Sequence, residues 1–179
     1  MSSRGLYTVR LAGLGDGEHE FSFELDHRFF ASFENPIVES GSVNAKVTLE
    51  KNQGLLALHF NLHGEVEVIC DRCLLSFMTS VEAIQDIFVK TGDFSGELED
   101  NVIMINKEDH EIDVAQYLYE YVVLSLPMQK IHPDREGGES GCDPEMLNKL
   151  KEYAAQKPEK KRDPDPRWDA LKGILENNN

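Results

Sequence analysis

The chain has 179 residues, 40% of them hydrophobic and 28% charged, which is enough for one domain with a hydrophobic core and an appended segment. Its net charge of −15 is uneven, because residues 149–179 carry +2 and the first 148 residues therefore carry −17. Proteins that bind nucleic acid through phosphates are usually basic, so this composition disfavours that class and suits either a basic protein partner or simple solubility.

No stretch approaches the ~18 apolar residues of a membrane span, and the first ten residues lack the apolar core of a signal peptide. We therefore expect a cytoplasmic protein with no membrane partner. In that compartment thiols stay reduced, so a pair of nearby cysteines indicates metal binding or redox chemistry rather than a structural disulfide.

Alternating apolar and polar residues predict β-strands through the first hundred residues. The alternation is clearest in 43–49 and 56–62, which flank Lys51-Asn52-Gln53-Gly54 and predict a hairpin. A further strand leads through Val68 into a turn at the cysteines, and alternation resumes beyond it. The expected strands, taken together, form an antiparallel meander and cover residues 6–11, 21–25, 43–49, 56–62, 66–70, 75–89 and 102–105.

Two helices are predicted after the strands. Asp113 can cap the first, and Gln116 three residues later completes a capping box, while Pro127 ends it. Its apolar stripe consists of Ala115, Leu118, Tyr119, Val122 and Leu126. Asp143 and Pro144 open the second helix, whose apolar side carries Leu147, Leu150 and Ala154.

The predicted fold class is α+β: an antiparallel β-meander sheet with one helix packed on it, plus C-terminal helical segments. We place a core domain at 1–143, a helix and charged linker at 144–162, and a closing helical motif at 163–179. In that motif we predict a helix that Asp165 caps and that has Pro166 at its first position. Its apolar stripe consists of Trp168, Leu171 and Leu175. So short a helix needs a docking site, on its own sheet or on a partner.

The three cysteines and one histidine form a candidate metal-ligand set. Cys70 and Cys73 have the spacing with which one tight turn aims two sulfurs at a tetrahedral ion, and His132 and Cys142 supply a distant second pair. Two features weaken this interpretation: nine residues separate the second pair, and Leu74 follows Cys73 where such turns favour glycine. The alternative is that the cysteines are small buried residues at a strand end. Redox chemistry is disfavoured, because no helix begins at the pair.

No catalytic residues are predicted. The histidines are scattered and no glycine-rich phosphate loop follows a strand, so neither an active site nor a small-molecule substrate is indicated. The sequence therefore favours a binding or assembly protein over an enzyme.

Three blocks of sequence resemble the YceD family, the large ribosomal RNA subunit accumulation proteins. The first is residues 66–74 with the Cys-x-x-Cys turn, and the second runs from Asp113 to His132 and on to Cys142. The third is the closing Asp165-Pro166-Arg167-Trp168. Many relatives have a fuller cysteine-rich segment that looks zinc-binding, whereas this chain has Pro144, Glu145 and Met146 where a further cysteine is expected.

The resemblance implies a non-enzymatic factor that supports accumulation or processing of large-subunit (23S) ribosomal RNA, with structural zinc as a possible cofactor. The expected partners are ribosome assembly components, above all a basic ribosomal protein. The alternatives are direct rRNA binding through Arg72 and the basic run 157–162, or a small zinc-binding structural module. The expected partner-binding residues are Arg72, Glu120, Arg167, Trp168, Leu171 and Leu175.

Overall fold

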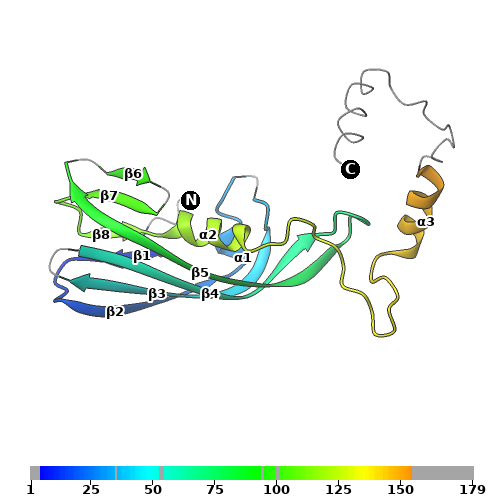
Figure 1. Cartoon of the computed structure of the whole chain (residues 1–179), viewed down its shortest axis with the longest axis horizontal. Coiled ribbons are helices and arrows are strands. Elements are labelled where there is room, and N and C mark those ends of the chain that lie inside the picture. The colour runs from blue at the N-terminus through cyan, green and yellow to red at the C-terminus, as the bar shows by residue number, and fades with distance from the viewer. Residues whose placement is uncertain (1–4, 35, 53–54, 94, 100, 155–179) are drawn as a thin grey trace, which may run out of the picture.

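A computed structural model describes residues 5–34, 36–52, 55–93, 95–99 and 101–154 (Figure 1). The basic run 157–162 and the closing motif 163–179, with Arg167, Trp168, Leu171 and Leu175, lie outside the described residues. Among the helices in the described ranges, none combines the length and apolarity needed to cross a membrane.

The fold is α+β, as predicted, and is built on one long, curved six-stranded sheet (Figure 1). The strand order in this sheet is β2-β3-β4-β5-β7-β6, and β1 pairs with β8 in a separate two-stranded sheet. The elements, in chain order, are β1 (Thr8–Arg10), β2 (Gly17–Leu25), α1 (His27–Phe30), β3 (Ser40–Asn52), β4 (Leu55–Ile69), β5 (Ser76–Gly92), β6 (Gly96–Glu99), β7 (Val102–Asn106), β8 (Glu111–Asp113), α2 (Ala115–Leu124) and α3 (Pro144–Tyr153).

The antiparallel meander holds from β2 to β5 but not beyond. After β5 the chain places β6 one position further out and returns through β7, which pairs parallel with β5 over Phe88–Gly92. The large sheet is therefore mixed. Alternation reveals that a segment is a strand, but it carries no information about which neighbour the strand pairs with.

The core lies between the inner face of the sheet and the elements that cover it. Most inward-facing positions of β3 and β4 are fully buried, as the alternation predicted, and α1, α2 and β8 contribute to the same cluster. Aromatic contacts join the layers: the ring of Phe60 on β4 lies 5.1 Å from that of Tyr121 on α2, and Phe33 stacks on Tyr119 at 4.2 Å. Burial of this apolar surface is what holds α2 on the sheet.

The start of α2 differs from the predicted capping box. Asp113 is the last residue of β8 and pairs with Thr8, so its backbone is extended and the N-cap position falls on Val114. The Asp113 carboxylate still accepts a hydrogen bond from the Ala115 N–H at 2.9 Å, but Gln116 donates to Glu120 instead of reaching back. Strand pairing thus shifts the helix start by one residue.

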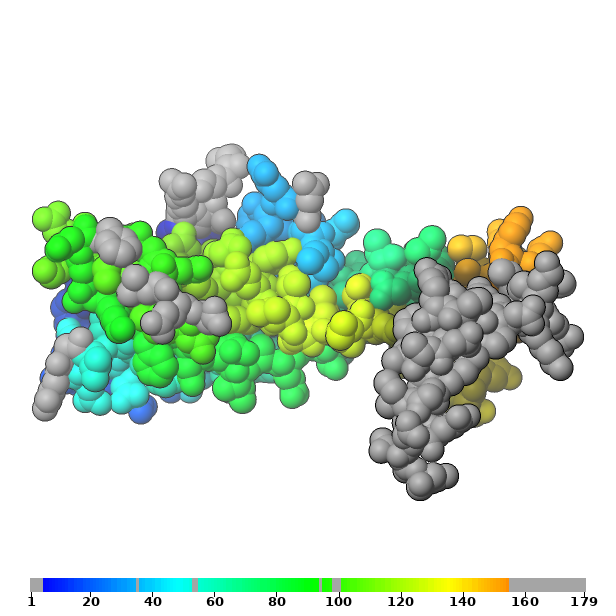
Figure 2. Space-filling model, turned by 45° about the horizontal axis from the view of Figure 1, so that its top comes forward, coloured from blue at the N-terminus to red at the C-terminus, as the bar shows by residue number. Residues whose placement is uncertain are grey.

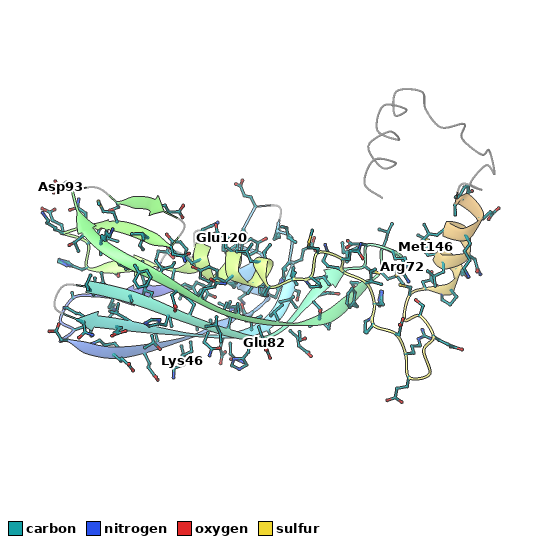
Figure 3. All side chains as sticks on the ribbon, viewed as in Figure 1. Lys46, Arg72, Glu82, Asp93, Glu120 and Met146 are labelled. Atoms are coloured by element: carbon teal, nitrogen blue, oxygen red, sulfur yellow. The ribbon has the colours of Figure 1, made fainter. Side chains whose placement is uncertain are left out.

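The outer face of the sheet is open and strongly acidic. On β2 to β5 the register places eight carboxylates on this face against two lysines, Lys46 and Lys90. Figure 3 shows Glu82 and Lys46 on this same side. The eight are Glu18, Glu20, Glu24, Glu50, Glu65, Glu67, Glu82 and Asp86.

His59 lies between two of these carboxylates. Its Nδ1 is 2.7 Å from the Asp86 carboxylate and its Nε2 is 3.3 Å from that of Glu50. The hydrogen bond to Asp86 raises the pKa of His59 above 6.5, with burial opposing it and the bond to Glu50 adding to it. Because the folded-state pKa is raised, protonated His59 stabilises the fold below about pH 6.5, and this contribution is lost as pH rises through the raised value.

We expect His59→Gln to lower the free energy of unfolding in acid and to have less effect in base. The loss at about pH 5.5 should not exceed ~1 kcal/mol, because the side chain is 42% exposed and water screens the charges. Chemical denaturation at about pH 5.5 and about pH 9 tests this, with His63→Gln on the same face as the control. Equal losses at the two pH values for the His59 variant would contradict it.

Candidate metal centre

Cys70, Cys73, His132 and Cys142, called the Cys3His group below, converge at one end of the molecule. One ligand atom from each lies within 4.8 Å of all the others, although the two pairs are some sixty residues apart in sequence. The first pair lies in the turn between β4 and β5, and the second lies in the segment that joins α2 to α3 (Figure 1). The three thiols are buried and the imidazole is half-buried.

The spacing of the ligand atoms suits a tetrahedral ion. Zinc–sulfur bonds of about 2.3 Å at tetrahedral angles place two sulfurs about 3.8 Å apart, and a sulfur and a nitrogen about 3.6 Å apart. The sulfurs of Cys70 and Cys142 are 3.8 Å apart, and the Cys73 sulfur is 3.3 Å from Nδ1 of His132. Three thiols and one imidazole are a donor set that structural zinc favours, so these residues could hold such an ion.

The Cys-x-x-Cys turn takes the required shape despite Leu74. The Leu74 N–H donates to the Cys70 carbonyl at 3.0 Å, and the Cys70 N–H donates to the Leu75 carbonyl at 2.9 Å. Leu74 itself adopts the left-handed region, with a φ of 63°. The backbone therefore holds the geometry that glycine would favour, and the leucine at this position does not count against the site.

The long spacing between His132 and Cys142 is accommodated by a closed loop. The Arg135 N–H donates to the Glu139 carbonyl at 2.7 Å, and Gly137 and Gly138 both have positive φ between these two residues. The chain doubles back so that Gly141 lies directly against the Pro133 carbonyl. The glycines thus return Cys142 to the side of His132, which the spacing alone did not indicate.

A reciprocal pair of hydrogen bonds clamps the turn to the downstream segment. The Asp71 N–H donates to the Lys130 carbonyl, and the Lys130 N–H donates to the Asp71 carboxylate, both at 2.7 Å. The Lys130 ammonium also lies 3.4 Å from that carboxylate. The backbone hydrogen bond from Lys130, ahead of its charge, lowers the pKa of Asp71. Sequence reasoning missed this contact, because no periodicity links residues 59 positions apart.

Apolar side chains enclose the thiols in a second, smaller core. Phe77, Ile131, Met146 and Leu147 pack around the three buried cysteines. The last two belong to α3, whose N-terminus is capped by the Asp143 carboxylate as predicted. The predicted apolar side of α3 is shifted: Met146 packs with Leu147, while Leu150 is 46% exposed. The ring of His132 lies 4.6 Å from that of Phe77, which orients the imidazole.

The surroundings of Cys70 favour its thiolate form. Burial alone raises the pKa of a thiol, but backbone N–H groups of Cys73, Arg72 and His132 outweigh burial and lower the pKa of Cys70 to about 5. Burial raises the pKa of Cys142. A thiolate is the form of cysteine that binds a metal ion.

The other predicted site residues lie apart from one another. Arg72 is exposed at the tip of the β4–β5 hairpin, beside α3 with its Met146, whereas Glu120 lies on α2 over the middle of the sheet (Figure 3). The Glu120 carboxylate accepts a hydrogen bond from Gln116 at 2.6 Å. The two described partner-binding candidates therefore do not form a single patch.

Comparison with known families identifies the chain. The family model described as "Large ribosomal RNA subunit accumulation protein YceD" matches residues 58–175, more than half of the sequence. The chain belongs to the YceD family. The match begins in β4 and includes both halves of the Cys3His group and α2. No curated protein and no solved structure matches the chain significantly.

The YceD family is named for accumulation of large-subunit ribosomal RNA and not for a reaction. This description agrees with the expected role in accumulation of large-subunit ribosomal RNA. The matched region also includes the closing motif with Arg167 and Trp168, and it leaves out β1, β2 and β3.

We expect Gly141→Ala to disrupt the second ligand pair. A Cβ at this position would overlap the Pro133 carbonyl oxygen and press on the His132 Cβ at 3.2 Å, so the loop must move. Metal content of the purified variant should fall by half or more, as about one kcal/mol or more of strain is imposed on the site. Gly137→Ala is a poor control because of its positive φ, whereas Gly15→Ala adds a Cβ to open space at a position without positive φ and should retain metal. Full metal content in Gly141→Ala would contradict the expectation.

Proposed function

We propose that the Cys3His group binds one structural zinc ion that fixes residues 128–147 to the tip of the β4–β5 hairpin. The convergence of four ligand atoms within 4.8 Å carries this proposal. All four positions are filled by protein ligands, so no coordination position is left open for a water or substrate, as catalysis would need. The ion would supply rigidity and no chemistry.

We further propose that the protein acts in the cytoplasm as a non-enzymatic factor in large-subunit assembly, by contact with a basic ribosomal protein. The acidic outer face of the sheet supports this. Eight carboxylates against two lysines would repel the phosphates of RNA and attract a cationic protein segment. Partners with Lys- and Arg-rich segments are abundant among proteins that themselves bind RNA.

A retention experiment tests the partner class. The immobilised protein is offered large-subunit ribosomal proteins and, separately, protein-free 23S rRNA. We expect the ribosomal proteins to be retained and the rRNA not to be. The double variant Glu65→Lys, Glu82→Lys on the outer face should weaken retention at least tenfold, whereas Glu136→Lys in the loop beside the metal centre should not. Retention of rRNA alone, weakening steeply with salt, would overturn the proposal.

We also propose that the closing motif anchors the partner through Arg167 and Trp168, together with Leu171 and Leu175, which the sequence also predicts to bind a partner. Arginine and tryptophan are among the residue types most often found as interface anchors. Removal of residues 163–179 should lower retention of the same ribosomal proteins. Identical retention by the shortened chain would refute this part alone. In cells, loss of the protein should lower the ratio of large- to small-subunit rRNA.

A further inference from the structure

We propose that a basic, extended segment of the partner adds as a strand to the open edge of β5 and places a lysine or arginine side chain in the hollow between β5 and α2. This deepens the proposed contact with a basic ribosomal protein and rests on it. The edge, the hollow and the charge around them each support this proposal independently.

β5 is paired on one side only along most of its length. It pairs with β4 from Ser76 to Val89, but β7 joins its other side only from Phe88 onward. Residues 77–87 therefore have no strand on that side within the described part of the chain. The green surface of β5 lies at the lower margin of the molecule in Figure 2. Such an edge is a template for a further strand.

The direction of the free backbone groups follows from two hydrogen bonds. The Phe88 N–H donates to Asn101 on the β7 side, whereas the Leu75 carbonyl accepts from Cys70 on the β4 side. Backbone groups alternate in direction along a strand, and the β4–β5 register has no shift. The N–H and C=O groups of even-numbered residues of β5 therefore point toward the open edge. The free N–H groups belong to Met78, Ser80, Glu82, Ile84 and Asp86.

This edge lacks several of the features that usually protect sheet edges in natural proteins. Residues 76–87 contain no proline and no lysine, and Met78 and Ile84 are 52% and 77% exposed. The opposite edge strand, β2, differs: three glutamates alternate along it, and Tyr7 packs beside Phe23. Both edge strands carry carboxylates, but β2 exposes no large apolar side chain whereas β5 exposes two beside Glu82 and Asp86, which favours β5 as the pairing site.

A hollow of about 340 Å³ lies beside the β5 edge and is suited to a cation. Its lining includes the carboxylates of Glu97 and Glu120 and the rings of Tyr117 and Tyr121. Carboxylates and aromatic faces together attract lysine and arginine side chains. Burial raises the pKa of Tyr121 to about 12, and nearby Tyr117, Glu120, Asp86 and Glu97 add to the increase, so the ring stays neutral. Glu120, which the sequence predicts to bind a partner, is one of the residues that line this hollow.

The negative charge around the β5 edge indicates which kind of segment can pair with it. Glu82 and Asp86 project from β5 beside the edge, and the first 148 residues carry −17, so a second copy pairing edge to edge would bring like charges together. A segment with alternating basic residues would instead place its charges against these carboxylates. The partner is therefore a cationic extended segment and not another copy of this chain.

The test uses a ten-residue peptide that alternates lysine with threonine, and a glutamate–threonine peptide as its control. The full-length protein should bind the basic peptide, and hydrogen exchange should slow at the five even-numbered amides. Ser80→Pro removes one free-edge N–H without changing charge and should weaken binding at least tenfold, while Ser80→Ala should not. Glu120→Gln should weaken it several-fold with no effect on the metal centre.

The outcomes separate this inference from the proposed function. Wild-type affinity in Ser80→Pro, or slowed exchange elsewhere than on β5, overturns strand addition even if ribosomal proteins are still retained. Binding of ten-residue oligouridylate in place of the peptide, or self-association through β5, overturns the choice of occupant. If the wild-type protein retains ribosomal proteins but not the peptide, the inference alone fails; if it retains neither, both fail.

Discussion

Cys142→Ser is expected to abolish stoichiometric zinc binding and to release residues 128–147 from the tip of the β4–β5 hairpin. Serine has nearly the size of cysteine but is a poor zinc ligand, so the change removes a bond while leaving the small core around it filled. Metal analysis of wild-type protein purified without chelator should find close to one equivalent of zinc, and the variant should hold less than about half.

The expected loss of order is large because the zinc ion would join two segments that have few other contacts with each other. Apart from the Asp71–Lys130 clamp and a few apolar contacts, the described contacts between the hairpin tip and the downstream segment involve the ligands themselves. Structural zinc contributes about 10–16 kcal/mol to the folding of zinc-finger peptides, so this end of the molecule should lose its order without it. Hydrogen exchange should accelerate at the amides of Asp71 and Lys130.

Met128→Ser is the matched control, because it makes a polar change in the same segment at a side chain that is almost fully exposed. It should retain both zinc and slow exchange. Wild-type protein that carries no zinc, or a Cys142 variant with full zinc, would refute the metal centre. The outcome for the acidic face and for the β5 edge does not depend on this result.

Phe60→Ala is expected to lower the free energy of unfolding by about 3–5 kcal/mol. Phe60 is one of the largest fully buried side chains, and its ring contacts Tyr117 and Tyr121 of α2. Its removal would leave a cavity between the sheet and the helix, where the surrounding strands can relax only in part. Denaturant titration followed by circular dichroism measures the loss.

Phe88→Ala is the control for this prediction. It removes the same side chain from the outer face of β5, where Phe88 is 52% exposed, and should cost about 1 kcal/mol or less. Equal losses in the two variants would mean that α2 is not held on the sheet through Phe60. Because α2 carries Tyr117 and Tyr121, the Phe60 variant should also bind the basic peptide less well.

The proposed metal site and the proposed partner surfaces lie in different parts of the molecule. The proposed zinc ion would stiffen the hairpin tip, whereas the proposed partner surfaces lie along the outer face and the free edge of the same strands. β4 and β5 run through both regions (Figure 1). A variant that loses zinc should therefore keep most of its affinity for the basic peptide.

Local patterns in the amino-acid sequence predicted the long strands, the helices α2 and α3, and the first ligand pair. The short elements α1, β6 and β8 were not predicted. Alternation predicted which side chains of β3 and β4 are buried, because side chains of a strand alternate between its two faces. Cys70 and Cys73 could be paired because four consecutive residues fix their geometry. The Asp143 cap of α3 was predictable for the same reason, since the cap and the amides it binds are two to three residues apart.

The tertiary structure decided whatever depends on residues that meet across long separations. It closed the loop that brings Cys142 back to His132, clamped Asp71 to Lys130, and let strand pairing displace the start of α2. It also placed β7 beside only one end of β5, which leaves the free edge. Such contacts depend on the summed packing of many segments, and no local period records them.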